Sequence, residues 1–589
     1  AVRSVRKLNP ELSTFRLEDI PLEDKATFAL FAAGNTTAVF QSESSPAKDL
    51  ERRLKGDSFD DIIALMALNR PGPLQSGMVD DFINRKNGRA KAEYFHPDLE
   101  PVLKPTYGVI VYQEQVMLIA QVLAGYTLGG ADLLRRAMGK KKPEEMATQR
   151  AIFTEGATKR GVDEKLATQL FDLMEKFADY GFNKSHSAAY AVIAVQTAWL
   201  KHYHAAAFMA ATMSSELADT DKVQMFYQDS LANSINFLPP DINASGIRFE
   251  SLDAQTIRYG LGAIKGTGEA ALGAILKARE NGGKLTPFTD LFDFCRRVDK
   301  RIVNRRVIEA LIRAGAFDAL DPPALDVNGK PLPVHRARLL ASVGVAIEAA
   351  DQAERNALQN NLFDDEFDGS GMLPPRHIEA AHWNERERLL NEKQALGFFF
   401  SGHPYHAYRA ELAPFVRKSL AQIEAQREPL LLAGIVISVR TQMTRRGKMA
   451  IVIIDDTSAQ VEIAVFNELF ESERAKIKED DLLLVDGKVR NDFSGLRVTA
   501  EKLLTLGEAR SRFAKRLHLS MNGGSNAEKL RTLLAPYRNG SCPVCLSYRN
   551  GEAEVELGLP DAWRVRLDDS LLTALNDWLS PNNVNVIYS

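Results

Sequence analysis

The chain has 589 residues, 45% of them hydrophobic and 26% charged, with a formal net charge of −3. This length exceeds what one hydrophobic core supports, so we expect about three to five domains. The charge excludes a uniformly basic coat, so any nucleic-acid binding must depend on local patches. Three cysteines are too few for a disulfide framework and indicate a reducing compartment. No secretory segment or apolar stretch of ~20 residues is present, so we expect a cytoplasmic protein with no membrane partner.

The first part of the chain, from about 23 to 245, has mainly helical periodicity. Apolar residues recur every three or four positions in 113–123 and in 164–177, which predicts one buried face on each helix. Asp163 is placed to cap the second helix, and Gly181 lies just past its end. Two helical hairpins are expected between 259 and 317, followed by a proline-rich linker (320–333), a helix (336–358) and an acidic linker (364–371).

After about residue 429 the period of the apolar residues changes from 3.6 to 2. Five strands are predicted at 431–440, 449–455, 460–466, 481–490 and 495–503, with a helix at 468–477. Five short strands with a helix after the third are typical of an OB-fold barrel. The predicted fold class is therefore multidomain and mainly α, followed by an all-β OB-fold barrel and a small α/β domain from about residue 510.

A basic run is the first candidate site. Five of the eight residues from 135 to 142 are basic and none is acidic: Arg135, Arg136, Lys140, Lys141 and Lys142. Arginine gives bidentate hydrogen bonds to phosphate oxygens and lysine adds point charge, so the run suits a triphosphate. The alternative is a solvated helix end on which Glu144 and Glu145 pair with the lysines.

The second candidate site is the segment 180–190. Gly181 would release the chain from one helix, and Ser185 or Ser187 could cap the next. Tyr180, Lys184 and His186 at this junction could stack on a base or sugar and contact phosphate. The alternative is that His186 is a structural hydrogen-bonding residue.

Four segments carry a resemblance to a known family: RPGPLQSGMVDDFI (70–83), TYGVIVYQEQVM (106–117), LLRRAMGKKKPEEM (133–146) and YGFNKSHSAAYAV (180–192). In this order they closely resemble the fingers of the bacterial C-family replicative polymerase, the alpha subunit of DNA polymerase III. The resemblance extends to the end of the chain. It implies that Arg135 and Arg136 hold the triphosphate of the incoming dNTP. It also implies that Tyr180 and His186 line the pocket near base and sugar, helping to reject ribonucleotides, while lysines 140 to 142 add charge.

The resemblance further implies a DNA-directed DNA polymerase that works by template-directed two-metal nucleotidyl transfer, with Mg²⁺ held by palm aspartates. The family's Asp-x-Asp pair, its Lys-x-Asp-Phe-x-Gly run and its PHP domain are not found in this sequence. We therefore expect a C-terminal portion of such a subunit, with no catalytic residue or metal ligand of its own and inactive alone. The adjacent acidic pairs are interpreted as solvated carboxylates: Asp60-Asp61, Asp80-Asp81, Asp364-Asp365, Asp455-Asp456 and Asp480-Asp481.

The segment 261–269 has the pattern of a helix-hairpin-helix, in which Gly266 and Gly268 let the backbone approach a phosphate beside Lys265. A plain capped helix is the alternative, but its place after the fingers matches the family's duplex-binding region. A basic cluster would add backbone contacts: Arg296, Arg297, Lys300, Arg301, Arg305 and Arg306. In the barrel region, single-stranded DNA is expected to contact Arg440, Arg445, Arg446 and Lys448, with Phe466 and Phe493 for stacking. A barrel used only as a spacer is the alternative.

Gln359, Leu362 and Phe363 resemble the peptide by which the family binds the sliding clamp, and they stand where the family carries it. The alternative is that the two apolar residues pack on their own domain. The last domain resembles the family's site for the tau subunit of the clamp loader, with no contact residue assigned. Cys542 and Cys545 are interpreted as packed residues, because no second pair of ligands lies nearby.

One segment departs from the family. After Val39-Phe40 the family usually reads Gln-Leu-Glu-Ser-Arg-Gly-Met, whereas residues 41–47 here read Gln-Ser-Glu-Ser-Ser-Pro-Ala. An arginine and a glycine are absent, which puts in doubt any contact made there. Pro46 is expected to change the local backbone.

The predicted organisation is a residual palm–fingers junction (1–22), fingers (23–245), a helix-hairpin-helix region (246–335), a clamp-binding region with its linker (336–428), an OB-fold (429–508) and a tau-binding domain (509–589). The expected partners are primed DNA, dNTP, sliding clamp and tau. A non-catalytic scaffold that tethers clamp and clamp loader to DNA is the main alternative. An anticodon-binding protein of the tRNA-synthetase type is a third, suggested by the barrel alone.

Overall fold

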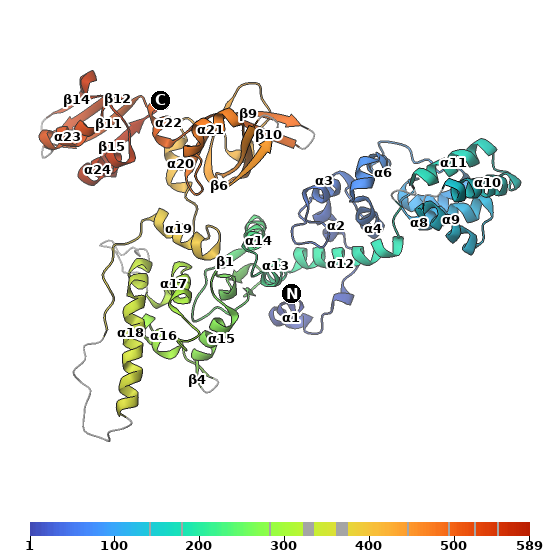
Figure 1. Cartoon of the computed structure of the whole chain (residues 1–589), viewed down its shortest axis with the longest axis horizontal. Helices are drawn as coiled ribbons and strands as arrows, with labels where there is room; N and C mark the ends of the chain where they lie inside the picture. The colour runs from blue at the N-terminus through green and yellow to red at the C-terminus, as the bar shows by residue number, and fades with distance from the viewer. Residues whose placement is uncertain are drawn as a thin grey trace. The chain divides into compact units, whose positions relative to one another are not determined.

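The computed structural model of the chain describes residues 1–140, 143–177, 181–281, 284–321, 335–360, 375–444, 447–492, 495–522, 526–550 and 553–588. The chain forms two compact units: unit 1 (Ala1–His382 with Gln394–Phe398) and unit 2 (Trp383–Lys393 with Phe399–Ser589). Unit 1 is mainly helical, and unit 2 carries a closed barrel and a small mixed sheet (Figure 1). The predicted fold class is therefore confirmed.

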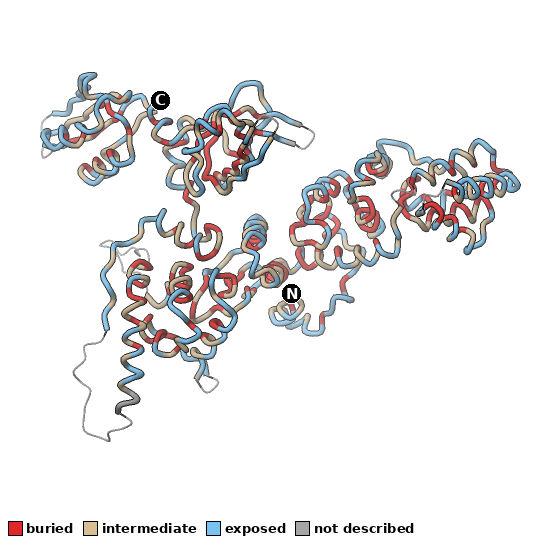
Figure 2. The backbone as a smooth tube through the Cα atoms, viewed as in Figure 1, coloured by how far each residue is buried: buried red, intermediate tan, exposed pale blue. Residues whose placement is uncertain are grey.

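The N-terminal helices of unit 1 form two lobes with separate hydrophobic cores. The first lobe contains α2 (Lys25–Ala32), α3 (Ser45–Leu54), α4 (Phe59–Leu68), α5 (Pro71–Gln75), α6 (Met78–Lys86) and α12 (Lys184–Tyr203), and α1 (Val2–Leu8) precedes it. The second contains α7 (Glu100–Leu103), α8 (Gln113–Ala124), α9 (Leu128–Lys140), α10 (Pro143–Lys159) and α11 (Glu164–Phe177). The buried segments line the inside of each lobe in Figure 2.

The two helices predicted from periodicity are confirmed as α8 and α11. Ile119 and Leu123 are buried on α8, and Leu170 and Met174 are buried on α11, so each helix buries the expected face. The Asp163 carboxylate accepts a hydrogen bond from the Leu166 N–H at 3.1 Å, as a cap should.

After α12, unit 1 continues with α13 (Ala205–Ser215) and α14 (Thr220–Ala232). A three-stranded sheet has the order β1 (Asn236–Leu238), β3 (Thr256–Arg258), β2 (Glu250–Ser251). Four helices come next: α15 (Glu269–Ala278), α16 (Leu291–Arg297), α17 (Arg305–Arg313) and α18 (Arg336–Asn360). A short hairpin, β4 (Glu280–Asn281) and β5 (Lys284–Leu285), joins α15 to α16. The predicted linkers fall largely within 322–334 and 361–374, outside the described residues.

The barrel of unit 2 closes in the strand order β10-β8-β7-β6-β9. Its strands are β6 (Leu430–Thr444), β7 (Gly447–Asp455), β8 (Gln460–Val465), β9 (Leu482–Asp492) and β10 (Gly495–Leu504), with α21 (Asn467–Glu473) after the third. Apolar residues alternate inward along β7, where Ala450, Val452 and Ile454 are all buried. The prediction of an OB-like barrel with a helix in this place is confirmed.

Unit 2 also contains α19 (Glu385–Leu396) in part, α20 (His406–Leu412) and α22 (Leu506–Phe513). The C-terminal sheet has the order β14 (Glu554–Gly558), β13 (Val544–Arg549), β11 (Arg516–Asn522), β15 (Val584–Ile587). The remaining elements of this part are α23 (Ala527–Leu534), β12 (Arg538–Cys542) and α24 (Asp569–Leu579). Leu530 on α23 and Leu575 on α24 pack in one core with the sheet, which confirms the small α/β domain.

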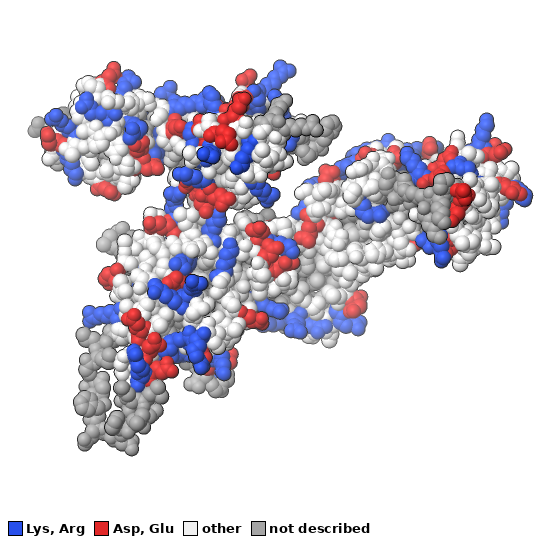
Figure 3. All heavy atoms as spheres, in the orientation of Figure 1, with Lys and Arg blue, Asp and Glu red and all other residues white. Residues whose placement is uncertain are grey.

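Acidic and basic side chains are interspersed in small groups on the face drawn in Figure 3. Among the described helices, none combines the length and apolar character needed to cross a membrane.

Candidate functional site

The start of α12 lies against the start of α8. Tyr112 and Phe182 form a parallel β-bridge, and the Gln113 N–H donates to the Phe182 carbonyl at 2.9 Å. The side-chain amide of Gln113 donates to the Gly181 carbonyl at 3.2 Å. A Cβ on Gly181 would lie 2.8 Å from the ring of Phe177, so a larger residue at this position would have to displace that ring.

Asn183 caps α12, because its side chain accepts a hydrogen bond from the His186 N–H at 2.8 Å. The prediction that Ser185 or Ser187 caps this helix was wrong: both lie inside its first turn, and Ser187 is fully buried. The asparagine side chain also donates to the Glu114 carboxylate at 2.8 Å, which fixes the helix start to α8.

The two arginines of the basic run lie on α9 and share one carboxylate. Arg135 Nη2 lies 2.7 Å from Asp132 Oδ1, and Arg136 Nε lies 2.8 Å from Asp132 Oδ2. The partner of both arginines is therefore Asp132, one turn earlier, whereas the sequence interpretation considered only Glu144 and Glu145, as partners of the lysines. Hydrogen bonds from Arg135, with the charge of Arg136, hold the pKa of Asp132 below its usual range.

Gln113 brings the two candidate segments together. Its side-chain oxygen accepts a hydrogen bond from Arg135 Nη1 at 3.4 Å, while its amide nitrogen contacts Gly181. One side of the site is thus a pair of guanidiniums and the other is the start of α12. The Arg136 side chain is 63% exposed, so its charge is open to a ligand. Tyr180, Lys141, Lys142 and the side chain of Lys140 lie outside the described residues.

Aromatic rings form a ladder along the exposed side of α12. The rings of Phe182 and His186 are 5.4 Å apart, and those of His186 and Tyr190 are 4.4 Å apart. The Arg70 guanidinium lies 4.1 Å from the centre of the Phe182 ring. The i, i+4 spacing of 182, 186 and 190 was visible in the sequence, but only His186 had been selected from it.

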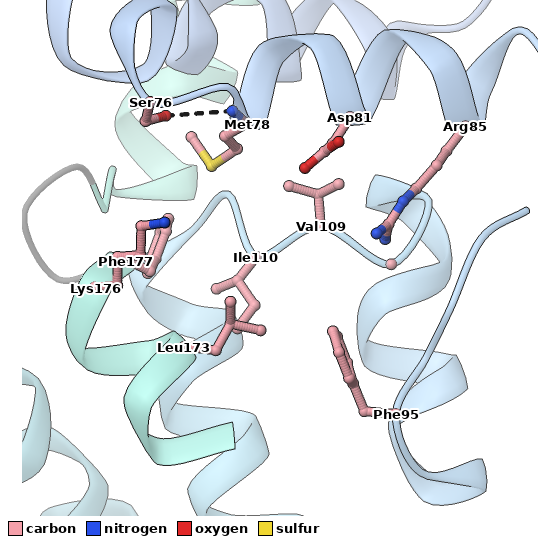
Figure 4. A pocket seen from close by; sticks show the side chains of 11 residues that line it. Ser76, Met78, Asp81, Arg85, Phe95, Val109, Ile110, Leu173, Lys176 and Phe177 are labelled. Atoms are coloured by element: carbon pink, nitrogen blue, oxygen red, sulfur yellow. Dashed lines mark hydrogen bonds between the residues drawn. The ribbon is translucent and has the colours of Figure 1, made fainter. Parts of the chain in front are cut away.

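A small cavity lies between the two lobes, lined by Met78, Val109 and Phe177 with Asp81 and Arg85 at its edge (Figure 4). Its volume is about 140 Å³. A drug-sized ligand needs a pocket of at least ~300 Å³, so this cavity does not hold a nucleoside triphosphate.

The interpretation of all acidic pairs as solvated was wrong for Asp61 and Asp456, which are buried. Asp61 lies 2.7 Å from Lys86 Nζ and accepts a hydrogen bond from the Tyr107 hydroxyl at 3.1 Å. Asp456 accepts hydrogen bonds from the Leu420 N–H and from the turn that follows it. Both carboxylates have structural partners. Within the described ranges, no group of three or more His, Cys, Asp or Glu side chains is placed to hold a metal ion.

The predicted helix-hairpin-helix has the expected local geometry. Gly266 has a φ of +84°, and Gly268 is the N-terminal cap of α15. A Cβ at either glycine would meet nothing within 4 Å, so both positions are open, beside an exposed Lys265.

The basic cluster near this hairpin is largely used within the protein. Arg297 is only 22% exposed and donates to the carbonyls of Ala278 and Thr286 at 2.7 and 2.6 Å. Lys300 pairs with Asp351 and Glu354 of α18, at 2.6 and 2.9 Å. The other members lie nearer the solvent: Arg296, Arg301 and Arg305, each paired with a carboxylate, and the exposed Arg306.

On the barrel, Lys448 is exposed and lies 5.9 Å from the centre of the Phe470 ring. Arg440 is exposed on β6 and Phe466 is 51% exposed, so both are available for contact. Arg445, Arg446 and Phe493 lie outside the described residues.

Gln359 lies in the last turn of α18, which runs to Asn360, two residues beyond the predicted end. Leu362 and Phe363 lie outside the described residues. Cys542 is buried, and the Cys545 thiol donates to Glu556 at 3.1 Å. Cys542 therefore fits the interpretation of packed cysteines, whereas Cys545 is only half-buried.

The departure at 41–47 covers the end of the loop before α3, its cap and most of its first turn. The Ser44 hydroxyl accepts a hydrogen bond from the Ala47 N–H at 3.3 Å. Pro46 occupies the first turn of the helix, where its missing N–H removes no helical hydrogen bond. Gln41 has a φ of +61°, a value that residues other than glycine rarely adopt.

Four family models match the chain in succession. They are the bacterial DNA polymerase III alpha subunit finger domain (residues 2–161), a helix-hairpin-helix motif (234–324), an OB-fold nucleic acid binding domain (430–506) and the DNA polymerase III subunit alpha C-terminal domain (529–579). The finger match covers both arginines of α9. Together the four matches decide against a tRNA-synthetase type of protein.

Curated relatives match almost the whole chain. The DNA polymerase III subunit alpha of Pseudomonas aeruginosa is 46% identical over 98% of this chain, and that of Neisseria meningitidis is 46% identical over 96%. The subunit from Escherichia coli is 44% identical over 96%. These alignments cover 50%, 48% and 49% of the relatives, so the chain spans about half their length. The chain therefore belongs to the bacterial DNA polymerase III alpha-subunit family, as its fingers motifs had predicted.

Proposed function

We propose that this chain supplies the nucleotide grip, the DNA grip and the partner attachments of a polymerase that synthesises DNA in the 5′-to-3′ direction on a template. The observation that carries the proposal is the contact of Arg135 and Gly181 with the same side chain, Gln113, in the region of the fingers. A cationic helix and an aromatic helix start are thereby fixed side by side.

In this proposal the triphosphate lies on Arg135 and Arg136, whose guanidiniums form charge-assisted hydrogen bonds with its oxygens. The sugar and base lie toward His186 and Tyr180, with lysines 140 to 142 adding charge. Asp132 orients both guanidiniums before the nucleotide arrives, which lowers the entropy lost on binding.

We propose Mg²⁺ as the cofactor of the complete polymerase and assign none of its ligands to this chain. When bound, a divalent cation neutralises phosphate charge and activates the attacking hydroxyl. The residues of this chain bind and orient the nucleotide and the DNA. The reaction takes place in the cytoplasm, at the nucleoid-associated replisome.

DNA contacts are proposed at three places in addition to the lysines of the fingers. The duplex lies on the open glycines of the hairpin with Lys265, and on Arg305 and Arg306. Single-stranded template lies on the barrel at Arg445 and Lys448. The lysines fall in the region proposed above as fingers (23–245), and the other places fall in the duplex-binding region (246–335) and the OB-fold (429–508).

The sliding clamp is proposed to bind Gln359, Leu362 and Phe363 within the region 336–428, and the tau subunit to bind the domain 509–589. Changing Leu362 and Phe363 together to Ala should abolish clamp binding in surface plasmon resonance with immobilised clamp. Retained binding by this double variant would show that another peptide is responsible.

The proposal as a whole is tested by fluorescence anisotropy of labelled primed DNA with and without the next correct dNTP. We expect salt-sensitive DNA binding that becomes tighter with the correct dNTP. The Arg135→Ala, Arg136→Ala double variant should bind the DNA and lose the dNTP effect. A wild-type chain that binds neither ligand would contradict the proposal, and a chain that binds DNA alone would favour the scaffold alternative.

A further inference from the structure

A loop far from α12 in the sequence completes its aromatic ladder. The ring of Phe40 lies 5.3 Å from that of Tyr190, which in turn lies 4.4 Å from His186. The stack therefore consists of Phe182, His186, Tyr190 and Phe40, and its last member comes from residues 34–44, between α2 and α3. Ring pairs at these distances attract each other beyond their buried area.

Hydrogen bonds hold the loop to the part of α12 that follows the aromatic residues. The Phe40 N–H donates to Thr197 Oγ1 at 3.1 Å. Lys201 Nζ donates to the Thr37 carbonyl at 2.9 Å and lies 2.8 Å from the Asp229 carboxylate. The Lys201 side chain is almost fully buried, so this attachment lies inside the fold rather than on its surface.

The backbone on either side of Phe40 is strained. Ala38 and Gln41 have φ values of +68° and +61°, which cost free energy for residues with a Cβ. Val39 between them is fully buried and acts as the anchor of the turn. Strain of this kind persists only where surrounding contacts hold it, and it often marks a side chain that must be presented in one direction.

A buried carboxyl group holds the base of the loop. Thr36 Oγ1 lies 2.8 Å from the Ser42 carbonyl and 2.6 Å from Glu51 Oε2. The Thr36 hydroxyl is thus within donor distance of both the Ser42 carbonyl and the Glu51 carboxyl group, which ties the two ends of the loop together. Burial raises the pKa of Glu51 to about 7, against the opposing effects of Thr36, Ser42, Lys48 and Arg52 around it. Of this network, Ser42 lies in the segment 41–47, whose sequence departs from the family.

We propose that Phe40 is a positioning residue of the nucleotide site: it supports Tyr190, Tyr190 supports His186, and the stack holds the imidazole in one place against the sugar of an incoming nucleotide. The proposal rests on the nucleotide grip proposed above. In this proposal the loop 34–44 controls how strongly the site prefers a deoxyribose to a ribose. A side chain can exclude the additional ribose hydroxyl by its shape only if it is held in a fixed position, so a mobile His186 would discriminate less.

The first part of the test needs no nucleotide. The rate at which diethyl pyrocarbonate modifies His186 is measured by mass spectrometry in the wild-type chain and in Phe40→Ala, Phe40→Tyr and Phe59→Ala. Loss of one ring pair should raise the rate in Phe40→Ala by about two- to tenfold. Phe40→Tyr keeps the ring and should restore the wild-type rate. Phe59 is the matched control, because it packs half-buried on the same lobe with no part in the stack.

The second part compares the dissociation constants of a dNTP and the matching rNTP in the presence of primed DNA. Phe40→Ala should reduce the rNTP-to-dNTP ratio by about two- to tenfold, while the affinity for inorganic tripolyphosphate stays unchanged. Phe40→Leu provides a packed variant if the alanine variant does not fold. An unchanged His186 rate together with an unchanged ratio overturns the proposal. A wild-type chain that binds no nucleotide contradicts the proposed function, yet the modification rates still decide whether Phe40 positions His186.

Discussion

Unit 1 has two clusters of basic residues, one on α9 and one near α16 and α17. Their sequences look alike, but the side chains of the first stay available to a ligand and several of the second are bound within the protein. On α9, two arginines share one carboxylate, and Arg136 stays 63% exposed. Near α16 and α17, Arg297 is 22% exposed and hydrogen-bonded to backbone carbonyls, while Lys300 is held by two carboxylates. A count of cations therefore overestimates the charge available to a ligand. A basic side chain is available to a ligand only if carboxylates and backbone carbonyls of the protein do not already bind it.

The largest expected effect comes from the cluster that is used internally. Arg297→Ala removes three carbonyl contacts, the Asp293 ion pair and the stacking on Phe288. We expect a loss of about 2–4 kcal/mol in the stability of this region. Limited proteolysis at rising temperature, with cleavage mapped between 278 and 305, measures it.

Arg301→Ala is the matched control, because Arg301 is 90% exposed and paired only with Asp299 among the described carboxylates. It should change stability by about 0.5 kcal/mol or less. Equal sensitivity of the two variants would remove the distinction between a structural and an available arginine.

The second prediction concerns the available cluster. Arg136→Ala should weaken dNTP binding by about tenfold or more, since a charge-assisted hydrogen bond contributes about 1.5–3 kcal/mol. The thermal stability of the chain should change little, because the side chain is mostly exposed. A dNTP titration beside a melting curve checks both. Unchanged affinity would show that the exposed charge of α9 serves another ligand.

A third prediction extends the comparison from basic residues to a buried acidic residue, Glu51. Glu51 has a pKa of about 7 in the folded chain and an ordinary value of 4.5 when exposed. The folded state holds the proton more tightly, so the stability of the loop 34–44 should fall as pH rises through this window and level off above about 7. The slope for one such group is at most about 1.4 kcal/mol per pH unit.

Glu51→Gln stays neutral and should remove this dependence. Hydrogen exchange of peptides covering 34–54, corrected for the intrinsic effect of pH and compared at pH 5.5 and 8, provides the measurement. The same dependence in both proteins would mean that Glu51 is already ionised in the folded state.

The smallest expected effect is that of Arg306→Ala on DNA binding. This arginine is exposed on α17, and one phosphate contact changes the salt dependence of binding by about one unit in the logarithmic slope. Anisotropy titrations at several salt concentrations measure this slope. Arg297→Ala serves as the comparison variant and is measured only at temperatures where it is folded. A slope that does not change would place the duplex elsewhere.

The sequence predicted the barrel well because each strand reports its own burial through alternation, as in β7, where Ala450, Val452 and Ile454 point inward. The site was predicted less completely. Asp132 was within reach of sequence reasoning, since it stands three and four positions before the arginines. The roles of Gln113 and Phe40 were not, because they depend on tertiary contacts between segments 68 and 150 residues apart, which no local pattern reports.

The most direct test of the central claim is photoaffinity mapping with an azido-dNTP on the wild-type chain in complex with primed DNA. The account predicts adducts on residues 132–136 and 180–190, competed by the unmodified correct dNTP and lost in the Arg135→Ala, Arg136→Ala variant. Competed adducts confined to other parts of the chain would contradict a nucleotide site between α9 and the start of α12.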